Sequence, residues 1–203
     1  MNINDMLLEY DVILASASPR RKELMQIICS NYRIIPSDCE EILPEDIVPE
    51  MAAEYISNAK CRCIAGVYDN SLVIGCDTVV INDGIVLGKP SDKDNAAQML
   101  RSLSGKTHKV ITGVTIGKGR HFSSFSTTTE VTFRNLSEED IQDYIATGEP
   151  MDKAGAYGIQ GFGSLLVEKI NGDFYNVVGL PVSDLAAELK KFLGTLKGIQ
   201  ISS

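Results

Sequence analysis

The sequence predicts an α/β protein with a mixed sheet, and three observations support that prediction. Apolar runs of strand length alternate with segments of helical periodicity along most of the 203 residues, which is typical of this class. Two long strand-like segments at 108–116 and 122–133 are joined by the short turn Gly117-Lys118-Gly119, so they should pair as an antiparallel hairpin. A second hairpin is expected at 79–86, around Asn82-Asp83-Gly84. Hairpins among interleaved helices make the sheet mixed rather than purely parallel.

The N-terminal elements are a strand, a helix and a second strand. Residues 10–15 are an apolar run of strand length. A helical pattern follows to about Ile28, with Ser18 as its N-cap and Pro19 at the first helical position, where a missing N–H costs nothing. A second strand is expected at 32–36.

The downstream elements follow from the same signals. Helices are expected where apolar residues recur every three or four positions after a Pro, Ser or Thr. We expect an acidic loop at 40–48, a helix from Pro49 to about Val67, and a strand at 72–75 that leads into Cys76-Asp77-Thr78. Two helices should follow, one capped by Ser91 and ending at Leu103, and one capped by Ser137 with Asp140 in the capping-box position. The remaining elements should be a glycine-rich loop at 155–163, a strand at 165–170, a turn region at 172–179 and a last helix from Pro181 to Leu193.

Composition is that of an ordinary globular protein. Apolar residues make up 44 % and charged residues 23 %, which excludes a collagen, a coiled coil and a wholly disordered chain. A chain of this length buries roughly 70 % of the surface of its unfolded state, so it can fold without disulfides or metals. We expect a single domain over 1–203, with its core at about 10–193 and loose tails at 1–9 and 195–203.

Charge and hydropathy restrict the partners. The chain has 19 Lys and Arg against 27 Asp and Glu, a formal net charge of −8, whereas a general binder of nucleic acid or anionic membrane needs a basic surface. No apolar run approaches the roughly 18–20 residues that cross a bilayer, and the acidic segment 1–10 lacks the order of a signal peptide. We therefore expect a cytoplasmic protein that binds neither nucleic acid nor membrane.

The five cysteines are expected to be free thiols. Their number is odd and no CxxC pair is present, which is typical of a reducing compartment. Cys61 and Cys63 lie two positions apart on an expected helix, so their side chains should point away from each other. His108 and His121 are the only histidines, and they are too far apart for a helical zinc site.

The first candidate for chemistry is the basic segment 16–22 (SASPRRK). Two hydroxyls, free backbone N–H groups, the positive end of a helix and three consecutive cations would converge at this strand-to-helix junction. That combination suits an anion, and the guanidinium fork of arginine suits phosphate. The alternative interpretation is a capped helix with solvated basic residues.

Acidic residues supply further candidates. Asp77 follows an apolar strand, where α/β sheets place their ligands, although a turn aspartate bonded to local backbone is an equal alternative. The acidic loop with Glu40 and Glu41 could offer oxygen ligands to Mg²⁺ or Mn²⁺, or could simply be solvated. Lys89 lies in a segment that imitates a P-loop but has the wrong glycine spacing and a proline after the lysine. It could still reach a phosphate as a point charge, although a surface lysine is the simpler interpretation.

Together these segments resemble the Maf family of nucleoside triphosphate pyrophosphatases. The resemblance runs from about Tyr10 to Leu193 and rests on six motifs in the family's order. The matching stretches are 14–21 (LASASPRR), 75–80 (GCDTVV), 87–90 (LGKP), 99–113 (MLRSLSGKTHKVITG), 149–161 (EPMDKAGAYGIQG) and 177–181 (VVGLP).

The resemblance implies a fold and a reaction. The fold is a long, twisted mixed sheet with helices on both sides and two lobes around a central cleft. The reaction cleaves a nucleoside triphosphate between its α and β phosphates, giving the monophosphate and pyrophosphate with a divalent cation, Mg²⁺ or Mn²⁺. A homodimer is also implied. The family is associated with arrest of septum formation, so the alternative is a nucleotide-binding regulator of cell division that acts without turnover.

The resemblance also implies roles for individual residues. Asp77 matches the catalytic acidic residue, which either activates water or binds the metal, and Glu41 falls at an acidic metal-site position. The positions expected to hold the triphosphate are Ser16, Arg20, Arg21, Lys60 and Lys89.

Substrate choice is implied by Arg20, Thr78 and Gln160, which look like the subfamily acting on dTTP and UTP rather than on 7-methylguanosine triphosphate. A glutamine amide offers one donor and one acceptor, which complements O4 and N3–H of thymine or uracil.

Overall fold

The computed structural model describes residues 2–201 and contains a seven-stranded mixed sheet. The strands are β1 (Val12–Ala15), β2 (Arg33–Ile34), β3 (Leu72–Asn82), β4 (Ile85–Leu87), β5 (Thr107–Lys118), β6 (His121–Phe133) and β7 (Val167–Asn171). Their order is β2-β1-β3-β5-β6-β7, with β4 paired to β3. β1 is parallel to both of its neighbours and the remaining pairs are antiparallel. The predicted α/β class and mixed sheet are confirmed.

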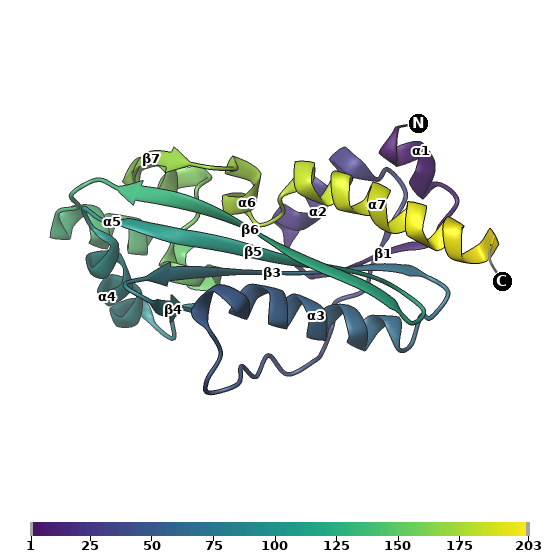
Figure 1. Cartoon of the computed structure of the whole chain (residues 1–203). Helices are drawn as coiled ribbons and strands as arrows, with labels where there is room; N and C mark the ends of the chain where they lie inside the picture. Colours follow the sequence, from purple (N-terminus) through teal and green to yellow (C-terminus); the bar gives the residue numbers. More distant parts are fainter. Residues whose placement is uncertain (1, 202–203) are drawn as a thin grey trace.

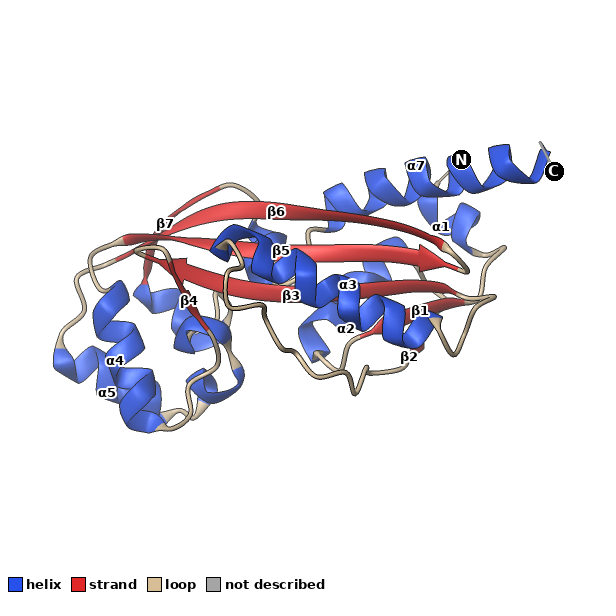
Figure 2. Cartoon of the chain, turned by 60° about the horizontal axis from the view of Figure 1, so that its bottom comes forward, coloured by secondary structure: helices blue, strands red, loops and turns tan. Residues whose placement is uncertain are grey.

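Helices cover both faces of this sheet. They are α1 (Ile3–Leu7), α2 (Pro19–Ile28), α3 (Ala52–Ala65), α4 (Lys93–Leu103), α5 (Glu138–Ala146), α6 (Phe174–Val178) and α7 (Val182–Ile201), with short 3₁₀ turns η1 (Pro49–Met51), η2 (Glu149–Asp152), η3 (Ala154–Ala156) and η4 (Gly161–Leu166). Helix α3 lies along one face of the central strands, and α2, α6 and α7 lie on the other (Figure 1). Helices α4 and α5 pack together at the far end of the sheet (Figure 2).

Two glycines allow α3 to pack directly on the sheet. A Cβ at Gly75 of β3 would lie 2.4 Å from the carbonyl oxygen of Ser57, and a Cβ at Gly113 of β5 would lie 2.3 Å from the backbone of Ala53. Any side chain at these two positions would push the helix away from the sheet. This close packing brings Lys60, which lies on α3, to the main cleft of the molecule.

Two of the four hydrophobic clusters that residues 2–201 form in the core define two lobes, and the other two lie between α3 and the sheet. One hydrophobic cluster joins α1, α2 and α7 to β1 and to the near halves of β3 and β5. A second cluster joins α4 and α5 to the far ends of β3, β5 and β6. The long central strands run through both lobes, and the main cleft opens between them. The expected two-lobed arrangement is therefore present.

Local sequence signals predicted several helix ends well. Ser18 caps α2 with Pro19 in its first turn, and Ser137 and Asp140 form a reciprocal capping box on α5. The expected cap on α4 is wrong, however. Asp92 rather than Ser91 accepts the N–H of Asn95, at 2.8 Å, because the helix begins one residue later and Asp92 takes the extended cap conformation.

The strands differ from expectation in their lengths. β3 runs without a break from the expected strand through Asp77 and into the hairpin, and it pairs with β4 beyond the turn. β2 has only two residues. The expected turn region at 172–179 contains the short helix α6, capped by Asp173.

The expected loose tails are wrong for the described residues. Ile3 and Leu7 bury one face of α1 and belong to the same hydrophobic cluster as Leu193 and Leu196 of α7. Each end of the chain thus buries apolar side chains against the other, which a local pattern does not reveal. The outermost positions, 1 and 202–203, lie outside the described residues.

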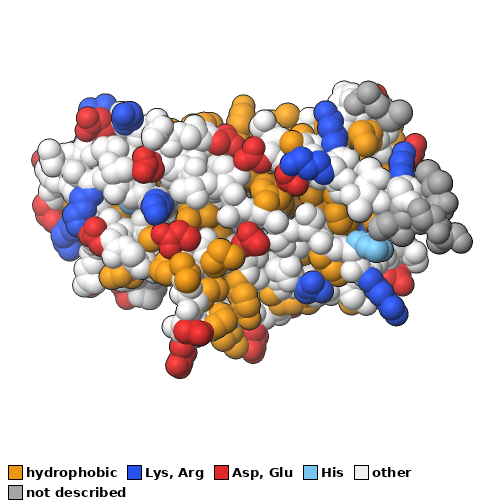
Figure 3. Space-filling view, in the orientation of Figure 1, with side chains coloured by type: hydrophobic (Ala, Val, Ile, Leu, Met, Phe, Trp, Pro, Cys, Tyr) orange, Lys and Arg blue, Asp and Glu red, His pale blue; other side chains and the backbone are white. Residues whose placement is uncertain are grey.

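The face seen in Figure 3 carries mixed charges and a protruding apolar ridge. Figure 3 shows hydrophobic side chains gathered over the segment that leads into α3, with acidic groups at its tip. Ile42, Val48 and Met51 are exposed there. No helix within residues 2–201 has the length and apolar character required to span a lipid bilayer.

Candidate active site

A cleft of about 610 Å³ lies between the two lobes, above the centre of β3. Every site residue expected from the sequence lines it, namely Ser16, Arg20, Arg21, Glu41, Lys60, Asp77, Thr78, Lys89 and Gln160. The topology explains this convergence. β1 ends at Ala15, which pairs with Gly75 of β3. The residues of β3 after Gly75 therefore have no strand beside them on the β1 side of the sheet, and the start of α2 lies there instead.

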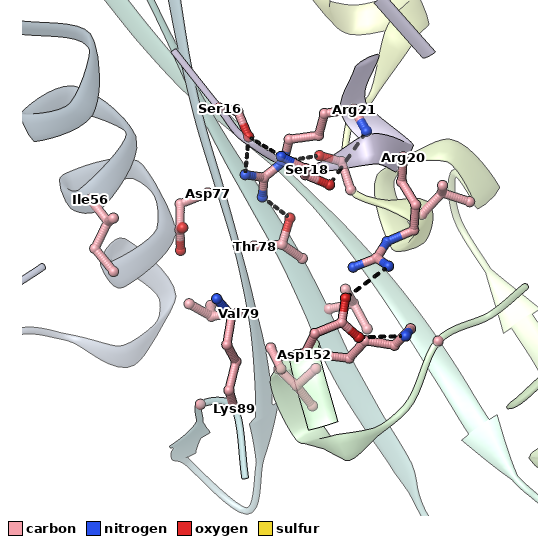
Figure 4. A pocket seen from close by; sticks show the side chains of 18 of the residues that line it. Ser16, Ser18, Arg20, Arg21, Ile56, Asp77, Thr78, Val79, Lys89 and Asp152 are labelled. Atoms are coloured by element: carbon pink, nitrogen blue, oxygen red, sulfur yellow. Dashed lines mark hydrogen bonds and ion pairs between the residues drawn. The ribbon is translucent and has the colours of Figure 1, made fainter. Parts of the chain in front are cut away.

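Asp77, Lys60 and Glu41 form a charged group on the α3 face of the sheet. The Lys60 ammonium lies 2.6 Å from Asp77 Oδ1 and 2.9 Å from Glu41 Oε1. The Lys60 and Asp77 side chains are only 12 % and 13 % exposed, whereas Glu41 is 53 % exposed. Figure 4 shows Asp77 and Lys89 pointing toward each other across the cleft.

The donor set of this group fits a magnesium-like ion held partly by substrate. Within residues 2–201 no three Asp, Glu, His or Cys side chains gather into a ready metal cage. Two carboxylates, Glu41 and Asp77, nevertheless converge on one cation, Lys60. Mg²⁺ commonly binds through one or two carboxylates together with waters and substrate phosphates, so these residues suit an ion that arrives with its triphosphate.

Arg21 is engaged with the protein rather than free for substrate. Its Nε donates to the carbonyl of Gly179 at 2.9 Å, and Nη1 donates to the Cys76 carbonyl at 2.8 Å and to Ser16 Oγ at 3.2 Å. Nη2 donates to Thr78 Oγ1 at 2.9 Å, and Figure 4 shows the side-chain partners. The guanidinium thus satisfies the carbonyl that β1 leaves open on β3. Because these bonds use most of its N–H groups, Arg21 has little donor capacity left for the phosphate contact that we expected.

The Thr78 hydroxyl is oriented by a chain of buried hydrogen bonds. Thr112 Oγ1 donates to the carbonyl of Asn176 at 2.9 Å, so its single proton is used. Thr78 must therefore donate to Thr112 across their 2.9 Å contact while it accepts from Arg21. One lone pair of Thr78 remains for a donor in the cleft. Asn176 is fully buried and was not predicted, because no local pattern marks a buried asparagine that bonds to a distant strand.

The opposite wall is held by a second ionic group. Arg20 lies 3.5 Å from Asp152 Oδ2, and Lys153 donates to Asp152 Oδ1 at 2.6 Å and to the carbonyl of Glu149 at 2.5 Å. The two cations face the cleft with one carboxylate between them. Sequence analysis did not single out Asp152, since an acidic residue beside a lysine is common on protein surfaces.

Lys89 and Gln160 are the unengaged side chains of the set. Both are exposed, and no other described residue hydrogen-bonds to either side chain. Their donors are therefore available to a ligand. Five cationic side chains in the described part of the chain line the cleft, namely Arg20, Arg21, Lys60, Lys89 and Lys153. The excess of negative charge in the chain therefore lies outside the cleft.

The expectation that all cysteines are free is wrong. Cys39 and Cys63 form a disulfide, with their Cα atoms 6.5 Å apart, whereas Cys29, Cys61 and Cys76 are free and buried. Sequence reasoning missed the pair because its members are 24 positions apart and belong to a loop and to an exposed face of α3. The disulfide links the segment that carries Glu41 covalently to α3. Burial raises the pKa of the Cys61 thiol to about 12, so it stays protonated and unreactive.

A cationic cleft with a partly buried lysine–carboxylate pair, placed where a parallel strand ends, defines an α/β enzyme for small phosphorylated substrates. A sequence model of the Maf-like protein family matches residues 11–192. The chain therefore belongs to the Maf family.

Curated relatives are similar along most of their length. The chain is 53 % identical over 181 residues to a dTTP/UTP pyrophosphatase of Bacillus velezensis, a match covering 89 % of this chain and 96 % of the relative. It is 49 % identical over 180 residues to a dTTP/UTP pyrophosphatase of a Geobacillus species, covering 89 % and 97 %. A solved structure, the Ham1 protein of Staphylococcus aureus, is 14 % identical with a TM-score of 0.47, covering 61 % and 71 %. That likeness is too slight to support an argument about function.

Proposed function

We propose that this chain is a pyrophosphatase that hydrolyses dTTP and UTP to the nucleoside monophosphate and pyrophosphate, and so removes these or modified pyrimidine triphosphates from the nucleotide pool. The observation that carries the proposal is the partly buried Asp77–Lys60 pair in a cleft lined by cations. Relatives near 50 % identity bear the corresponding name. Nucleoside triphosphates are cytoplasmic metabolites, and a cytoplasmic homodimer is part of the same proposal.

The cleft suits a triphosphate along its cationic wall. Lys60, Lys89 and Arg20 come from three separate elements and face one space, so they can neutralise a chain of phosphates and align its α–β bridge. Positioning and electrostatic stabilisation dominate phosphoryl transfer, since little covalent chemistry is required of the protein. Arg21 contributes indirectly by fixing Thr78 and the end of β3.

Asp77 is placed to activate water. Its Oδ1 is held by Lys60, which leaves Oδ2 able to accept a proton from a water molecule in the cleft. The water oxygen bonds to the α phosphorus, the bond from that phosphorus to the bridging oxygen breaks, and pyrophosphate leaves. A divalent ion held by Glu41 and Asp77 would supply further charge neutralisation for the phosphates.

Gln160 is our candidate for reading the base. Its amide is free and carries a donor for O4 and an acceptor for N3–H. Gln160→Glu removes the donor and adds a negative charge, and we expect kcat/KM for UTP to fall by roughly 30-fold, about 2 kcal/mol. Inhibition by inorganic tripolyphosphate, which has no base, should stay unchanged. A comparable loss of tripolyphosphate binding would contradict a base-reading role.

Pyrophosphate release from a panel of nucleoside triphosphates with Mg²⁺ or Mn²⁺ tests the proposal. We expect turnover of dTTP and UTP by the wild type and a loss of at least about 100-fold in Asp77→Asn, which cannot accept the proton. Orthophosphate as the product would contradict cleavage at the α–β bridge. Tight UTP binding without any release would instead favour a regulator that acts without turnover.

A further inference from the structure

Two side chains outside the cleft fix the segment that carries Gln160. Glu149 Oε2 accepts the backbone N–H of Phe162 at 3.1 Å, and its Oε1 accepts that of Gly163 at 3.3 Å. The Tyr144 hydroxyl donates to Glu149 Oε1 at 3.1 Å. The same hydroxyl accepts the backbone N–H of Gly158, also at 3.1 Å. We call Tyr144 and Glu149 the backbone clamp.

The glycines of the segment allow this clamp to close. A Cβ at Gly161 would lie 2.8 Å from Glu149 Oε2, in a residue whose φ is +64°. A Cβ at Gly163 would lie 2.7 Å from the Tyr144 hydroxyl and 2.1 Å from the carbonyl of Gly158. Backbone and clamp are therefore in contact on both sides of Gln160, and only glycine allows that approach.

The clamp also connects the segment to the ionic wall of the cleft. The Glu149 carbonyl accepts from Lys153, which is bonded to Asp152, the partner of Arg20. Tyr144 is buried within the second lobe, so its hydroxyl is anchored by packing. A loop rich in glycine loses much entropy when it is ordered, and a charged acceptor that binds two N–H groups offsets part of that loss.

We propose that Glu149 and Tyr144 are positioning residues for base recognition, which hold Gln160 where it discriminates a pyrimidine with O4 from one with an amino group at that carbon. This inference rests on the proposed function. It assigns the selectivity for uracil over cytosine to the backbone clamp as well as to the Gln160 amide. Neither clamp residue touches the substrate.

The sharpest variant is Glu149→Gln, which has the same shape but presents one donor where the backbone requires two acceptors. We expect kcat/KM for UTP to fall about tenfold and that for CTP, which pairs with Gln160 only when the amide is turned over, to stay within twofold. The UTP-to-CTP ratio should therefore fall about tenfold, and Tyr144→Phe should change it in the same direction. Tripolyphosphate inhibition should be unchanged. The matched control is Glu139→Gln, an exposed carboxylate on α5, the helix that also carries Tyr144.

A double-mutant cycle separates positioning from general damage. If Glu149 acts through Gln160, the UTP activity of Glu149→Gln combined with Gln160→Ala should equal that of Gln160→Ala alone. Additive losses, or equal losses for UTP and CTP, would overturn the inference.

Amide hydrogen exchange gives a readout that needs no activity. Glu149→Gln should speed exchange in residues 158–163 about tenfold while α4 is unaffected, and unchanged exchange would overturn the clamp. If the wild type releases no pyrophosphate from UTP or dTTP, the proposed function and the selectivity role fail together, while the exchange result still decides whether the clamp holds its segment.

Discussion

Lys60 of α3 donates to Asp77 of β3 at 2.6 Å, and solvent reaches less than a sixth of either side chain. The two residues are 17 positions apart in the sequence and belong to different layers of the fold. They meet because glycines on β3 and β5 let α3 lie directly on the sheet. The contact fixes the carboxylate that we expect to activate water, so the packing of α3 bears on both stability and catalysis.

Removing the Lys60 ammonium should destabilise the folded protein. Lys60→Met leaves two carboxylates facing each other, one of them largely buried, and the free energy of unfolding should fall by about 2 kcal/mol in urea. Lys106→Met is the matched control, since Lys106 pairs with Asp83 at 2.9 Å on the exposed surface, where ion pairs contribute about 0–1 kcal/mol. Equal losses of unfolding free energy in the two variants would show that the Lys60 ion pair stabilises the fold no more than a surface pair does.

Arg21→Lys should disturb the cleft although charge is retained. Lysine cannot reproduce bonds to Thr78, Ser16 and two carbonyls, because it lacks the planar fork. We expect about 2 kcal/mol lower stability together with at least tenfold lower kcat/KM for UTP, measured by urea unfolding and pyrophosphate release. Lys22→Ala, the exposed neighbour, should change neither. Intact stability with lower activity would instead indicate that Arg21 binds phosphate directly.

The disulfide should stabilise the segment that carries Glu41. Cross-linking Cys39 to Cys63 closes a loop across 24 positions, for which restriction of the unfolded chain gives about 3 kcal/mol. Reduction with dithiothreitol should lower the urea midpoint of the wild type, and Cys63→Ser should lower it by the same amount without further response to the reductant. A wild type that already behaves like Cys63→Ser would mean that the bond is not formed in the isolated protein.

His108 should make stability depend on pH. Burial lowers its pKa to about 4, and its Nε2 lies 2.7 Å from the Tyr157 hydroxyl. The unfolded chain takes up this proton near the usual pKa of about 6.5, whereas the folded chain does not, so stability falls as pH drops from 6.5 toward 4. Between pH 7 and pH 5 the wild type should lose about 2 kcal/mol more than His108→Phe in urea unfolding. The control His121→Gln, at an exposed position, should lose as much stability as the wild type between pH 7 and pH 5.

Short-range signals in the sequence were reliable where one turn of backbone decides the outcome. Ser18 with Pro19, and Ser137 with Asp140, mark helix starts because a cap bonds to N–H groups two or three residues away. Ser91 failed as a cap because Asp92, one position later, is an equally good acceptor and binds the N–H of Asn95 instead. The motif residues were found because their chemical types in that order resemble a family.

The sequence by itself thus determined the α/β class, most helix starts and nine of the side chains that line the cleft. Only the tertiary structure decided what those residues do to one another. In the folded chain, Arg21 donates to the carbonyl of Gly179, 158 positions away, and Lys60 pairs with Asp77. Cys39 is bonded to Cys63, and α1 and α7 contribute to one hydrophobic cluster. These outcomes depend on which distant backbones approach each other, and that is set by the burial of whole faces rather than by any local pattern.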